Sequence, residues 1–417
     1  MSVRWSAVAV MAIMSAALTA VVPVASGDPL RHATVAGAAS PAAEAATSPP
    51  WRLDDVPVQG RANLVGVTAV ARDDAWAVGF TVTGKAAAAT AEGSSAATGR
   101  MRAAVQADQC DDHGLPSLAL HWDGASWSQA PIPDSGRLTS VSASGPGNVW
   151  AAADCGVLHW DGRTWARTSP VSIPGTDGAD LTGIKAVGAD DVWLSGTAWN
   201  GTTGKDHGFV QHWDGSRWRL VPLPALGDDF DISGVDARGP QDVWVAGTDH
   251  TGYETHAERL LLLHWNGHGW KRFAEPANTM WRKNAVRVRA VASDDVWLAV
   301  IGRRVPDGND IRRPLLLHWD GTAWADTHAP EERGDLHDVA ADGRTVLAAG
   351  DTWSPLDVEY EAYARRWTGD GWTPAPLPAP GQASIAALAP IPGGGMWAVG
   401  ATGDEQTMRP FIARSGH

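Results

Sequence analysis

The sequence predicts an all-β protein, a seven-bladed β-propeller closed by an N-terminal strand that completes the last blade. Three observations carry this prediction. One phrase occurs seven times, each copy holds four short β-rich runs, and the first and last copies are truncated in complementary ways. Four antiparallel strands repeated at a period near 50 residues are typical of propeller blades.

The first half of the phrase reads Leu-x-x-Val-x-Ala, a short turn, then Asp-Val-Trp-x-x-Gly, as in residues 181–196. Its Trp falls at positions 76, 150, 193, 244, 297 and 397, with Leu347 in its place once. The successive gaps are 74, 43, 51, 53, 50 and 50 residues, so only the first repeat carries a large insertion. Two β-rich runs joined by Gly, Asp and Pro turns indicate a hairpin.

The second half reads Leu-x-His-Trp-Asp-Gly-x-x-Trp, as in residues 118–127. An Asp-Gly pair between two apolar runs is a strong signal for a tight β-hairpin. The last copy stops within residues 411–417, after its third run. Residues 51–57 match the missing fourth run, so we expect them to pair with residues 411–414 and close the ring.

Both motifs resemble the Trp-rich secreted β-propeller repeats of actinobacterial proteins, over residues 51–417. The Asp-Gly-x-x-Trp hairpin is also distantly similar to the Asp-box of sialidase-like propellers. It is one residue shorter and lacks the leading Ser or Thr, so the resemblance implies no sialidase chemistry. The Gly-His element of WD40 repeats and the Gly-Gly pair of kelch repeats are missing.

The N-terminal segment has the features of an export signal. Residues 1–27 hold one early positive charge, an apolar stretch and small residues suited to cleavage, which predict a signal peptide. The alternative is an uncleaved membrane anchor, because the apolar stretch approaches the length that spans a bilayer. Residues 28–50 are rich in Ala, Pro and Ser and predict a disordered linker before the propeller of residues 51–417.

The formal net charge is −14, which argues against nucleic acid and anionic membrane surfaces as partners. Export places the protein outside the cell, where paired cysteines are the rule. We therefore expect Cys110 and Cys155 to form a disulfide that fastens the long first insertion. Two free thiols are the alternative, because the insertion is long enough to hold Cys110 far away.

Function is expected at the face that carries the connections between second and third strands and the crossovers between blades, here named the long-loop face. Three Trp residues outside the repeat map there, Trp199, Trp281 and Trp353. Either they fold back on the surface, or they form a platform on which a ligand stacks. Further ligand-binding candidates on this face are Asp206, His207, Asp249, His250 and Asp351. Their carboxylates leave Ca²⁺ open as a ligand, but without recognised ligand spacing, so no cofactor is expected.

Two other groups of residues recur within the repeat. His121, His159, His212, His264 and His318 precede the outer Trp in five copies. One His per blade is too widely spaced for a shared metal, so each is expected to hydrogen-bond within its own blade. Lys185, Asp236 and Arg289 share one inner-strand position and form either an ion-pair ladder or a polar site.

Two classes of function remain open from the sequence. The first is a secreted, noncatalytic and monomeric binding propeller that recognises a glycan, a peptide or a protein of the cell envelope. The second is an extracellular hydrolase or lyase with carboxylates or His at the mouth of the channel. No nucleophile and base pair is visible as a motif, which favours binding.

Overall fold

The computed structural model describes residues 51–82, 115–251, 258–277, 282–304, 311–329, 333–343, 345–353, 360–379, 381–404 and 406–416. Contacts divide the chain into two units, Met1–Thr47 and Ser48–His417, and every described residue belongs to the second. All regular elements in these ranges are β-strands, which confirms the all-β class. Within the same ranges, no helix is long and apolar enough to cross a membrane. The expected signal peptide and linker lie outside the described residues.

Antiparallel pairing builds five four-stranded sheets and one larger sheet from the described residues. The first two four-stranded sheets are β2 (Ala62–Ala71), β3 (Asp74–Thr81), β4 (Ser117–Trp122), β5 (Trp127–Gln129), and β6 (Leu138–Gly145), β7 (Asn148–Ala153), β8 (Gly156–Trp160), β9 (Trp165–Thr168). The next two are β18 (Arg282–Ala292), β19 (Asp295–Arg304), β20 (Ile311–Trp319), β21 (Trp324–Asp326), and β22 (Gly334–Ala341), β23 (Val346–Trp353), β24 (Tyr360–Trp367), β25 (Trp372–Pro374). The fifth is β26 (Ala383–Pro390), β27 (Met396–Thr402), β28 (Arg409–Ser415) and β1 (Arg52–Asp54).

The larger sheet has eight strands and consists of two four-stranded parts. These are β10 (Gly178–Ala186), β11 (Val192–Asn200), β12 (Lys205–Trp213), β13 (Trp218–Leu220), and β14 (Phe230–Gly239), β15 (Asp242–Asp249), β16 (Arg259–Trp265), β17 (Trp270–Phe273). A single parallel pair, His207 with Phe230, joins them. Apart from this pair, each part repeats the topology of the other sheets.

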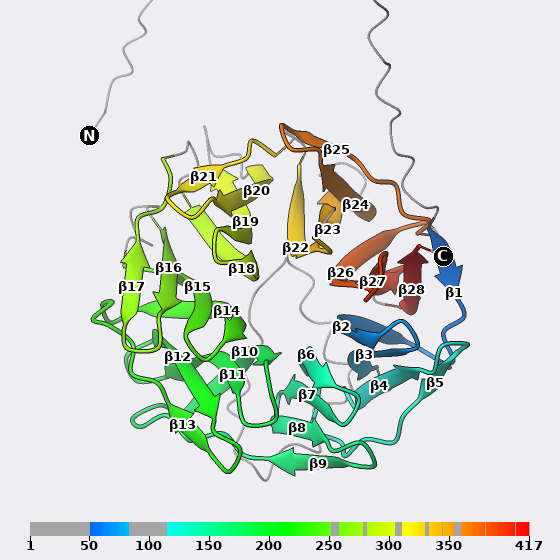
Figure 1. Cartoon of the computed structure of the whole chain (residues 1–417), viewed down its shortest axis with the longest axis horizontal. Coiled ribbons are helices and arrows are strands. Elements are labelled where there is room, and N and C mark those ends of the chain that lie inside the picture. Colours follow the sequence, from blue (N-terminus) through cyan, green and yellow to red (C-terminus); the bar gives the residue numbers. More distant parts are fainter. Residues whose placement is uncertain are drawn as a thin grey trace, which may run out of the picture. The chain divides into compact units, whose positions relative to one another are not determined.

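The sheets stand side by side around a common centre (Figure 1). The first strand of each repeat lies innermost and contacts the first strand of the next, in the order β2, β6, β10, β14, β18, β22, β26 and again β2. Side chains of adjacent sheets form shared apolar clusters, such as the one that joins Trp122 and Trp127 to Trp397. Packing between sheets therefore supplies the core, and the innermost strands surround the centre.

The N-terminal strand β1 belongs to the same sheet as the C-terminal strand β28. Arg52 pairs with Arg414, and Asp54 pairs with Ile412. The Arg414 Nε donates a hydrogen bond to Asp54 Oδ1 at 3.0 Å, and the guanidinium lies 4.4 Å from the ring centroid of Trp122. The pairing predicted between the two ends of the chain is thus present at residues 52–54.

A β-bulge occurs in each innermost strand that the structure describes, and in most repeats the Gly of the Asp-Val-Trp-x-x-Gly motif lies opposite it. The register shifts between Leu64 and Gly66 in β2, and corresponding shifts occur in the other six inner strands that the structure describes. The bulge brings the inner backbone close to the next strand. A Cβ added to Gly79 would lie 1.9 Å from the Asn63 carbonyl oxygen, and one added to Gly247 only 2.0 Å from the Asp231 oxygen. Only Gly fits there.

Candidate functional site

The His residues before the outer Trp make hydrogen bonds within their own sheets, as predicted. His212 Nε2 lies 2.8 Å from Asp191 Oδ1, and the same oxygen accepts a hydrogen bond from Trp193 Nε1 at 2.8 Å. The imidazole also packs on the indole, with ring centroids 4.5 Å apart. The other four members, His121, His159, His264 and His318, make equivalent bonds of 2.8 to 3.0 Å. The Asp or Asn at the start of the strand, whose role the sequence did not reveal, thus holds the imidazole in all five repeats and also the indole of Trp150, Trp193 and Trp297.

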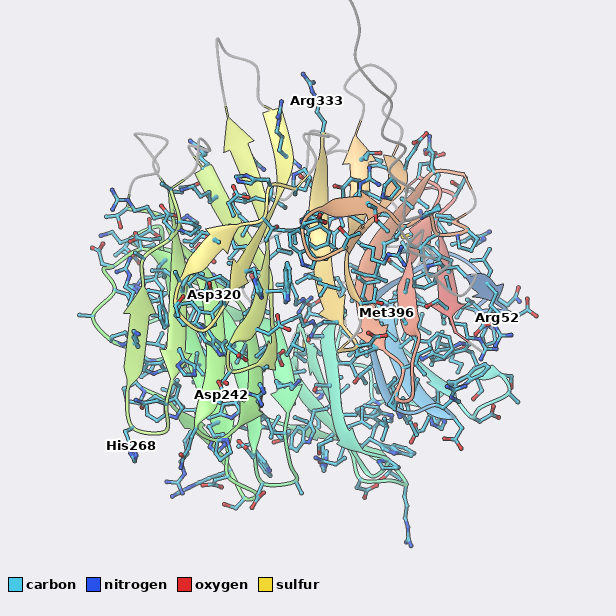
Figure 2. The ribbon with its side chains drawn as sticks, turned by 45° about the horizontal axis from the view of Figure 1, so that its top comes forward. Arg52, Asp242, His268, Asp320, Arg333 and Met396 are labelled. Carbon is cyan, nitrogen blue, oxygen red and sulfur yellow. The ribbon has the colours of Figure 1, made fainter. Side chains whose placement is uncertain are left out.

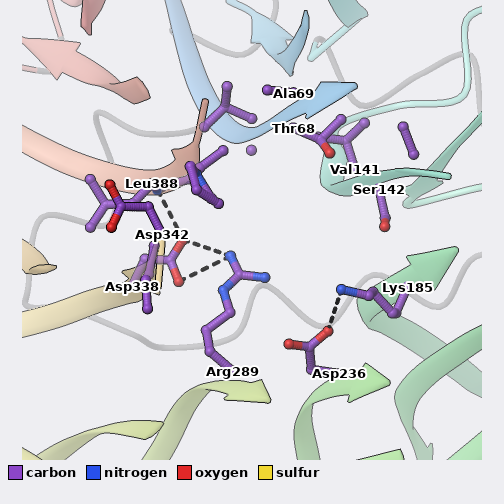
Figure 3. Close-up of a pocket in the computed structure, with 18 of the residues that line it drawn as sticks. Thr68, Ala69, Val141, Ser142, Lys185, Asp236, Arg289, Asp338, Asp342 and Leu388 are labelled. Carbon is purple, nitrogen blue, oxygen red and sulfur yellow. Dashed lines mark hydrogen bonds and ion pairs between the residues drawn. The ribbon is translucent and has the colours of Figure 1, made fainter. Parts of the chain in front are cut away.

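A cavity of about 540 Å³ lies among the innermost strands, with lining residues from every sheet (Figure 3). Its wall includes Asp342 and Gly343 after β22 and residues 390–394 after β26. These turns join first and second strands, so the cavity is nearest the face opposite the long-loop face, here named the short-turn face. Figure 2 separates the two faces, with Arg333 before β22 at one end and His268 in the β16–β17 hairpin at the other.

Charged side chains of consecutive inner strands form ion pairs along one side of this cavity. Lys185 Nζ lies 2.7 Å from Asp236 Oδ1, and Arg289 Nη2 lies 2.9 Å from Asp338 Oδ2. Each carboxylate also accepts a backbone N–H of the following sheet, Asp236 from Ala290 at 2.8 Å and Asp338 from Leu388 at 2.9 Å. Of the two alternatives for Lys185, Asp236 and Arg289, the ion-pair ladder is observed in part: Lys185 pairs with Asp236, whereas Arg289 pairs with Asp338, which the sequence analysis missed.

The electrostatics of the ladder follow from burial and pairing together. Burial alone raises the pKa of Asp236, but the charges of Lys185 and Arg289 outweigh it and hold that pKa below its ordinary value. Arg287 is different. Burial lowers the pKa of this guanidinium, and the Asp338 carboxylate, whose Oδ1 lies 3.7 Å from its Nε, offsets that effect only in part. The cavity wall thus holds one cation with weaker compensation than its neighbours.

The other side of the cavity carries small and hydroxylated residues. Thr68, Ser140 and Ser142 line it together with Ala and Val side chains. The Ser142 hydroxyl accepts a hydrogen bond from Ala186 N at 3.0 Å, and the Ser140 hydroxyl accepts one from Ile184 N at 3.3 Å. Figure 3 shows Thr68 and Ser142 across the pocket from Arg289. The cavity therefore combines fixed cations with hydroxyl groups and apolar surface.

On the long-loop face, Trp199 is buried rather than available for a ligand. Strands β11 and β12 extend far into the connection between second and third strands and leave only residues 201–204 between them. Trp199 is 6% exposed in β11, and a Cβ added to Gly178 would lie 2.3 Å from its Cζ2 atom. Of the two alternatives for this Trp, folding back is the one observed. Trp199 is buried because its pairing with Asp206 continues the sheet.

The two other Trp candidates are not placed by the structure. Trp281 and Cys110 lie outside the described residues, and only the backbone of Trp353 is described, at the end of β23. Cys155 lies in the turn between β7 and β8, where its backbone N donates to Ser135 O at 3.0 Å. The disulfide and the Trp platform therefore stay predictions.

Asp206, His207 and Asp249 are strand residues with protein partners. Asp206 is 5% exposed, and its N–H donates to Asp229 Oδ1 at 3.1 Å. The His207 ring contacts Phe230 edge to face, with centroids 6.4 Å apart. Asp249 lies 3.5 Å from Arg272 Nη2 and accepts the Thr251 N–H at 3.1 Å. These contacts hold the Asp206 backbone, the His207 ring and the Asp249 carboxylate against neighbouring residues.

His250 lies between two buried carboxylates. Its Nε2 is 3.0 Å from Asp231 Oδ2, and its Nδ1 is 3.4 Å from Glu258 Oε1. Burial by itself lowers the pKa of His250, but the bonds to Asp231 and then Glu258 outweigh it and raise that pKa to about 10. The imidazolium is therefore fixed in its charged form, which suits a structural ion pair better than proton transfer near neutral pH.

Asp351 bridges two sheets. It is 6% exposed and accepts hydrogen bonds from His337 Nε2 at 2.9 Å and from the Ser384 hydroxyl at 2.6 Å. The serine thus donates to a carboxylate and not to the imidazole. A nucleophile needs its hydroxyl within reach of a base that can take the proton, and here the His faces the Asp instead.

A second cavity of about 500 Å³ lies at the outer rim between the β2–β5 and β6–β9 sheets. Trp76, Trp160 and Trp165 line it, together with Ala130. At the corresponding position of the β14–β17 part, Phe273 packs between Trp244 and Trp319, with centroids 5.4 and 4.7 Å away. The small side chain of Ala130 thus leaves a groove between two sheets, at a position that the Phe273 ring fills in the β14–β17 part.

Comparisons with known proteins show the fold. No family model matches the chain, and no curated protein matches it either. Among solved structures, "YCF48 bound to D1 peptide" is similar at a TM-score of 0.50 and 13% identity, covering 88% of this chain and 97% of that one. A protein of unknown function from Dyadobacter fermentans is similar at a TM-score of 0.51 and 10% identity, covering 88% and 99%.

A third similar structure is the extracellular domain of the hybrid two-component system BT3049 from B. thetaiotaomicron. Its TM-score is 0.47 at 11% identity, and the likeness covers 87% of this chain and 42% of that one. The chain therefore spans less than half the length of that structure. At 10 to 13% identity, the likeness to YCF48 and to the Dyadobacter fermentans protein concerns architecture alone, and it agrees with a β-propeller type of fold.

Proposed function

We propose that the chain is a secreted, noncatalytic binding propeller whose ligand enters the central cavity from the short-turn face. The observation that carries this proposal is the cavity itself. It is concave, about 540 Å³ in volume, and lined by polar groups held in place by ion pairs and backbone hydrogen bonds. Ligand sites are commonly preformed cavities of about 300–1,000 Å³ with a few fixed polar groups.

We propose further that the sheets form seven blades in a closed ring. The two parts of the eight-stranded sheet each have the four strands of a blade, which brings the five other sheets to seven blades. The contact between β26 and β2 and the pairing of β1 with β28 support closure. A closed ring leaves no exposed inter-blade edge and keeps the inner strands at fixed distances, which a preformed cavity requires.

Binding without catalysis is supported by the state of the His and Ser side chains near acidic groups. His250 is paired with two carboxylates, and Ser384 donates to Asp351. The likeness to a propeller that was solved with a bound peptide is also consistent with a binding role. A glycan, a peptide or an envelope protein can each present a polar group of a size that enters the cavity.

The signal-like residues 1–27 support export. Export in turn supports a disulfide between Cys110 and Cys155, because cysteines of exported proteins are usually paired. The long-loop face remains a second candidate surface because Trp281 lies there in the sequence. It contributes less to the proposal, since its described candidates Trp199, Asp206 and Asp351 are buried among protein partners.

A ligand screen with two matched Trp substitutions tests which face binds. Thr68→Trp obstructs the cavity, whereas Thr203→Trp adds the same ring to an exposed turn of the long-loop face. Small polar compounds are screened by ligand-observed NMR against the parent chain and both variants, after circular dichroism shows that each is folded. The proposal expects ligands that keep binding to Thr203→Trp and lose binding to Thr68→Trp. Ligands lost only with Thr203→Trp would place the site on the long-loop face instead.

A further inference from the structure

The central cavity has more hydrogen-bond donors than acceptors free to meet a ligand. The acceptors are already occupied. Asp236 accepts from Lys185, from Ala237 N at 3.0 Å and from Ala290 N at 2.8 Å. Asp338 accepts from Arg289 and from two backbone N–H groups, those of Val339 and Leu388. Each carboxylate thus directs its lone pairs into the protein wall.

The donors are less fully used. Arg287 Nε is buried and makes no hydrogen bond to any residue that the structure describes. A guanidinium carries five N–H donors and no acceptor, and Arg287 is among the residues that line the cavity. The Lys185 ammonium has three N–H donors, and its ion pair with Asp236 uses one of them. Ser142 accepts a hydrogen bond from Ala186, which leaves its own hydroxyl hydrogen to donate.

The residues that correspond to Arg287 in four other inner strands are small. The β-bulges place Gly66, Ser140, Gly183 and Gly234 at positions that correspond to Arg287. Of these four, Gly66 and Ser140 line the cavity, together with Ala69, Ala143 and Thr68. Asp342 is the remaining acidic residue of the wall, and it lies at the turn end with Oδ1 accepting the Thr345 N–H at 2.7 Å.

From this arrangement we propose that the central cavity binds a small organic carboxylate, with its oxygens toward Arg287, Lys185 and Arg289 and its remainder toward Thr68, Ser142 and the Ala side chains. A guanidinium matches the planar, two-oxygen geometry of a carboxylate and gains most where water is excluded. The proposal rests on the proposed function, because it names the class of ligand for the same cavity.

Two pairs of probes that differ only in the acidic group test the ligand class. Glucuronate is compared with glucose, and benzoate with benzyl alcohol, by isothermal titration calorimetry at low ionic strength. Inorganic phosphate is added as a separate arm. The expected result is that at least one carboxylate binds at least tenfold tighter than its neutral partner and tighter than phosphate. Phosphate binding tighter than both carboxylates, or neutral partners binding equally well, overturns the carboxylate class.

Two substitutions, each of which removes one positive charge, test whether carboxylate binding depends on the cavity or only on the net charge of the protein. Arg287→Met is expected to weaken carboxylate binding at least tenfold, whereas Lys205→Met, which removes an exposed cation on the long-loop face, is expected to leave it within twofold. Equal losses in both variants contradict the site. Binding of neutral probes that Thr68→Trp abolishes would keep the cavity as the ligand site and overturn only the carboxylate inference. Absence of any probe sensitive to Thr68→Trp overturns both.

Discussion

Arg289 Nη2 lies 2.9 Å from Asp338 Oδ2, across the boundary between the β18–β21 and β22–β25 sheets. Asp338 is 0% exposed, and it also accepts the backbone N–H of Leu388 from the sheet beyond. One carboxylate thereby connects three successive sheets. The same residues form the wall of the proposed ligand site, so rigidity of the ring and the shape of the cavity have a common origin.

Substitution of Asp338 tests this structural role. Asp338→Ala leaves Arg287 and Arg289 without their carboxylate in a buried wall, and breaking such a pair costs about 3–5 kcal/mol. We expect the free energy of unfolding, measured by urea denaturation, to fall by that amount. Asp370→Ala, in an exposed outer hairpin, is the control and should change it by less than about 0.5 kcal/mol. Equal effects of the two substitutions would show that the ladder contributes nothing specific.

Removal of β1 tests closure of the ring. Deletion of residues 1–57 removes the strand that pairs with β28 and the Asp54 partner of Arg414, so we expect aggregation or a far lower melting temperature. Deletion of residues 1–47, the other unit of the chain, is the control and should leave the melting temperature unchanged. Closure by β1 is refuted if both deletions melt like the parent chain in differential scanning calorimetry.

The pH dependence of stability reports on His250. Its folded-state pKa of about 10 lies above its ordinary value of 6.5, so its stabilisation is complete below pH 6.5 and is lost as the pH rises toward 10. His250→Gln removes this dependence. The difference in unfolding free energy between parent and variant should therefore shrink from pH 6.5 to pH 10. His268→Gln, at an exposed hairpin, should show no such trend, and a parent-to-His250→Gln difference that is constant with pH contradicts the assignment.

Thiol titration tests the disulfide between Cys110 and Cys155. The exported, oxidised protein should show no free thiol under denaturing conditions, and two after reduction. We expect reduction to lower the melting temperature, because a bridge over the intervening 44 residues restricts the unfolded chain. Detection of two free thiols before reduction would mean that the insertion holds Cys110 out of reach.

Much of the fold could be predicted because its determinants are local and repeated. The Asp-Gly hairpins, the Trp found in six of the seven second strands and the fourth run at residues 51–57 all follow from short motifs. The hydrogen bond of each His before the outer Trp could also be expected. One His per sheet lies too far from the next to share a metal ion, so its ring must find a partner within its own sheet. These features depend on neighbours within one repeat.

The candidate site could be predicted only in part, because it depends on contacts between repeats. Lys185, Asp236 and Arg289 occupy the same position in three consecutive repeats, so the sequence alone identified them as a group. Asp338 and Arg287 stand at another position, and the bulge in each inner strand decides which side chains reach across the channel. The burial of Trp199 could not be predicted for a related reason, since the continued pairing of β11 with β12 has no counterpart in the repeated motif.

A crystal structure of the chain with the tightest ligand from the NMR screen tests the central claim most directly. The account predicts ligand density inside the inner strands, between Arg287 and Thr68, with an acidic group toward the guanidinium. Density confined to the long-loop face, near Asp206 or Asp249 and away from the cavity, would contradict it.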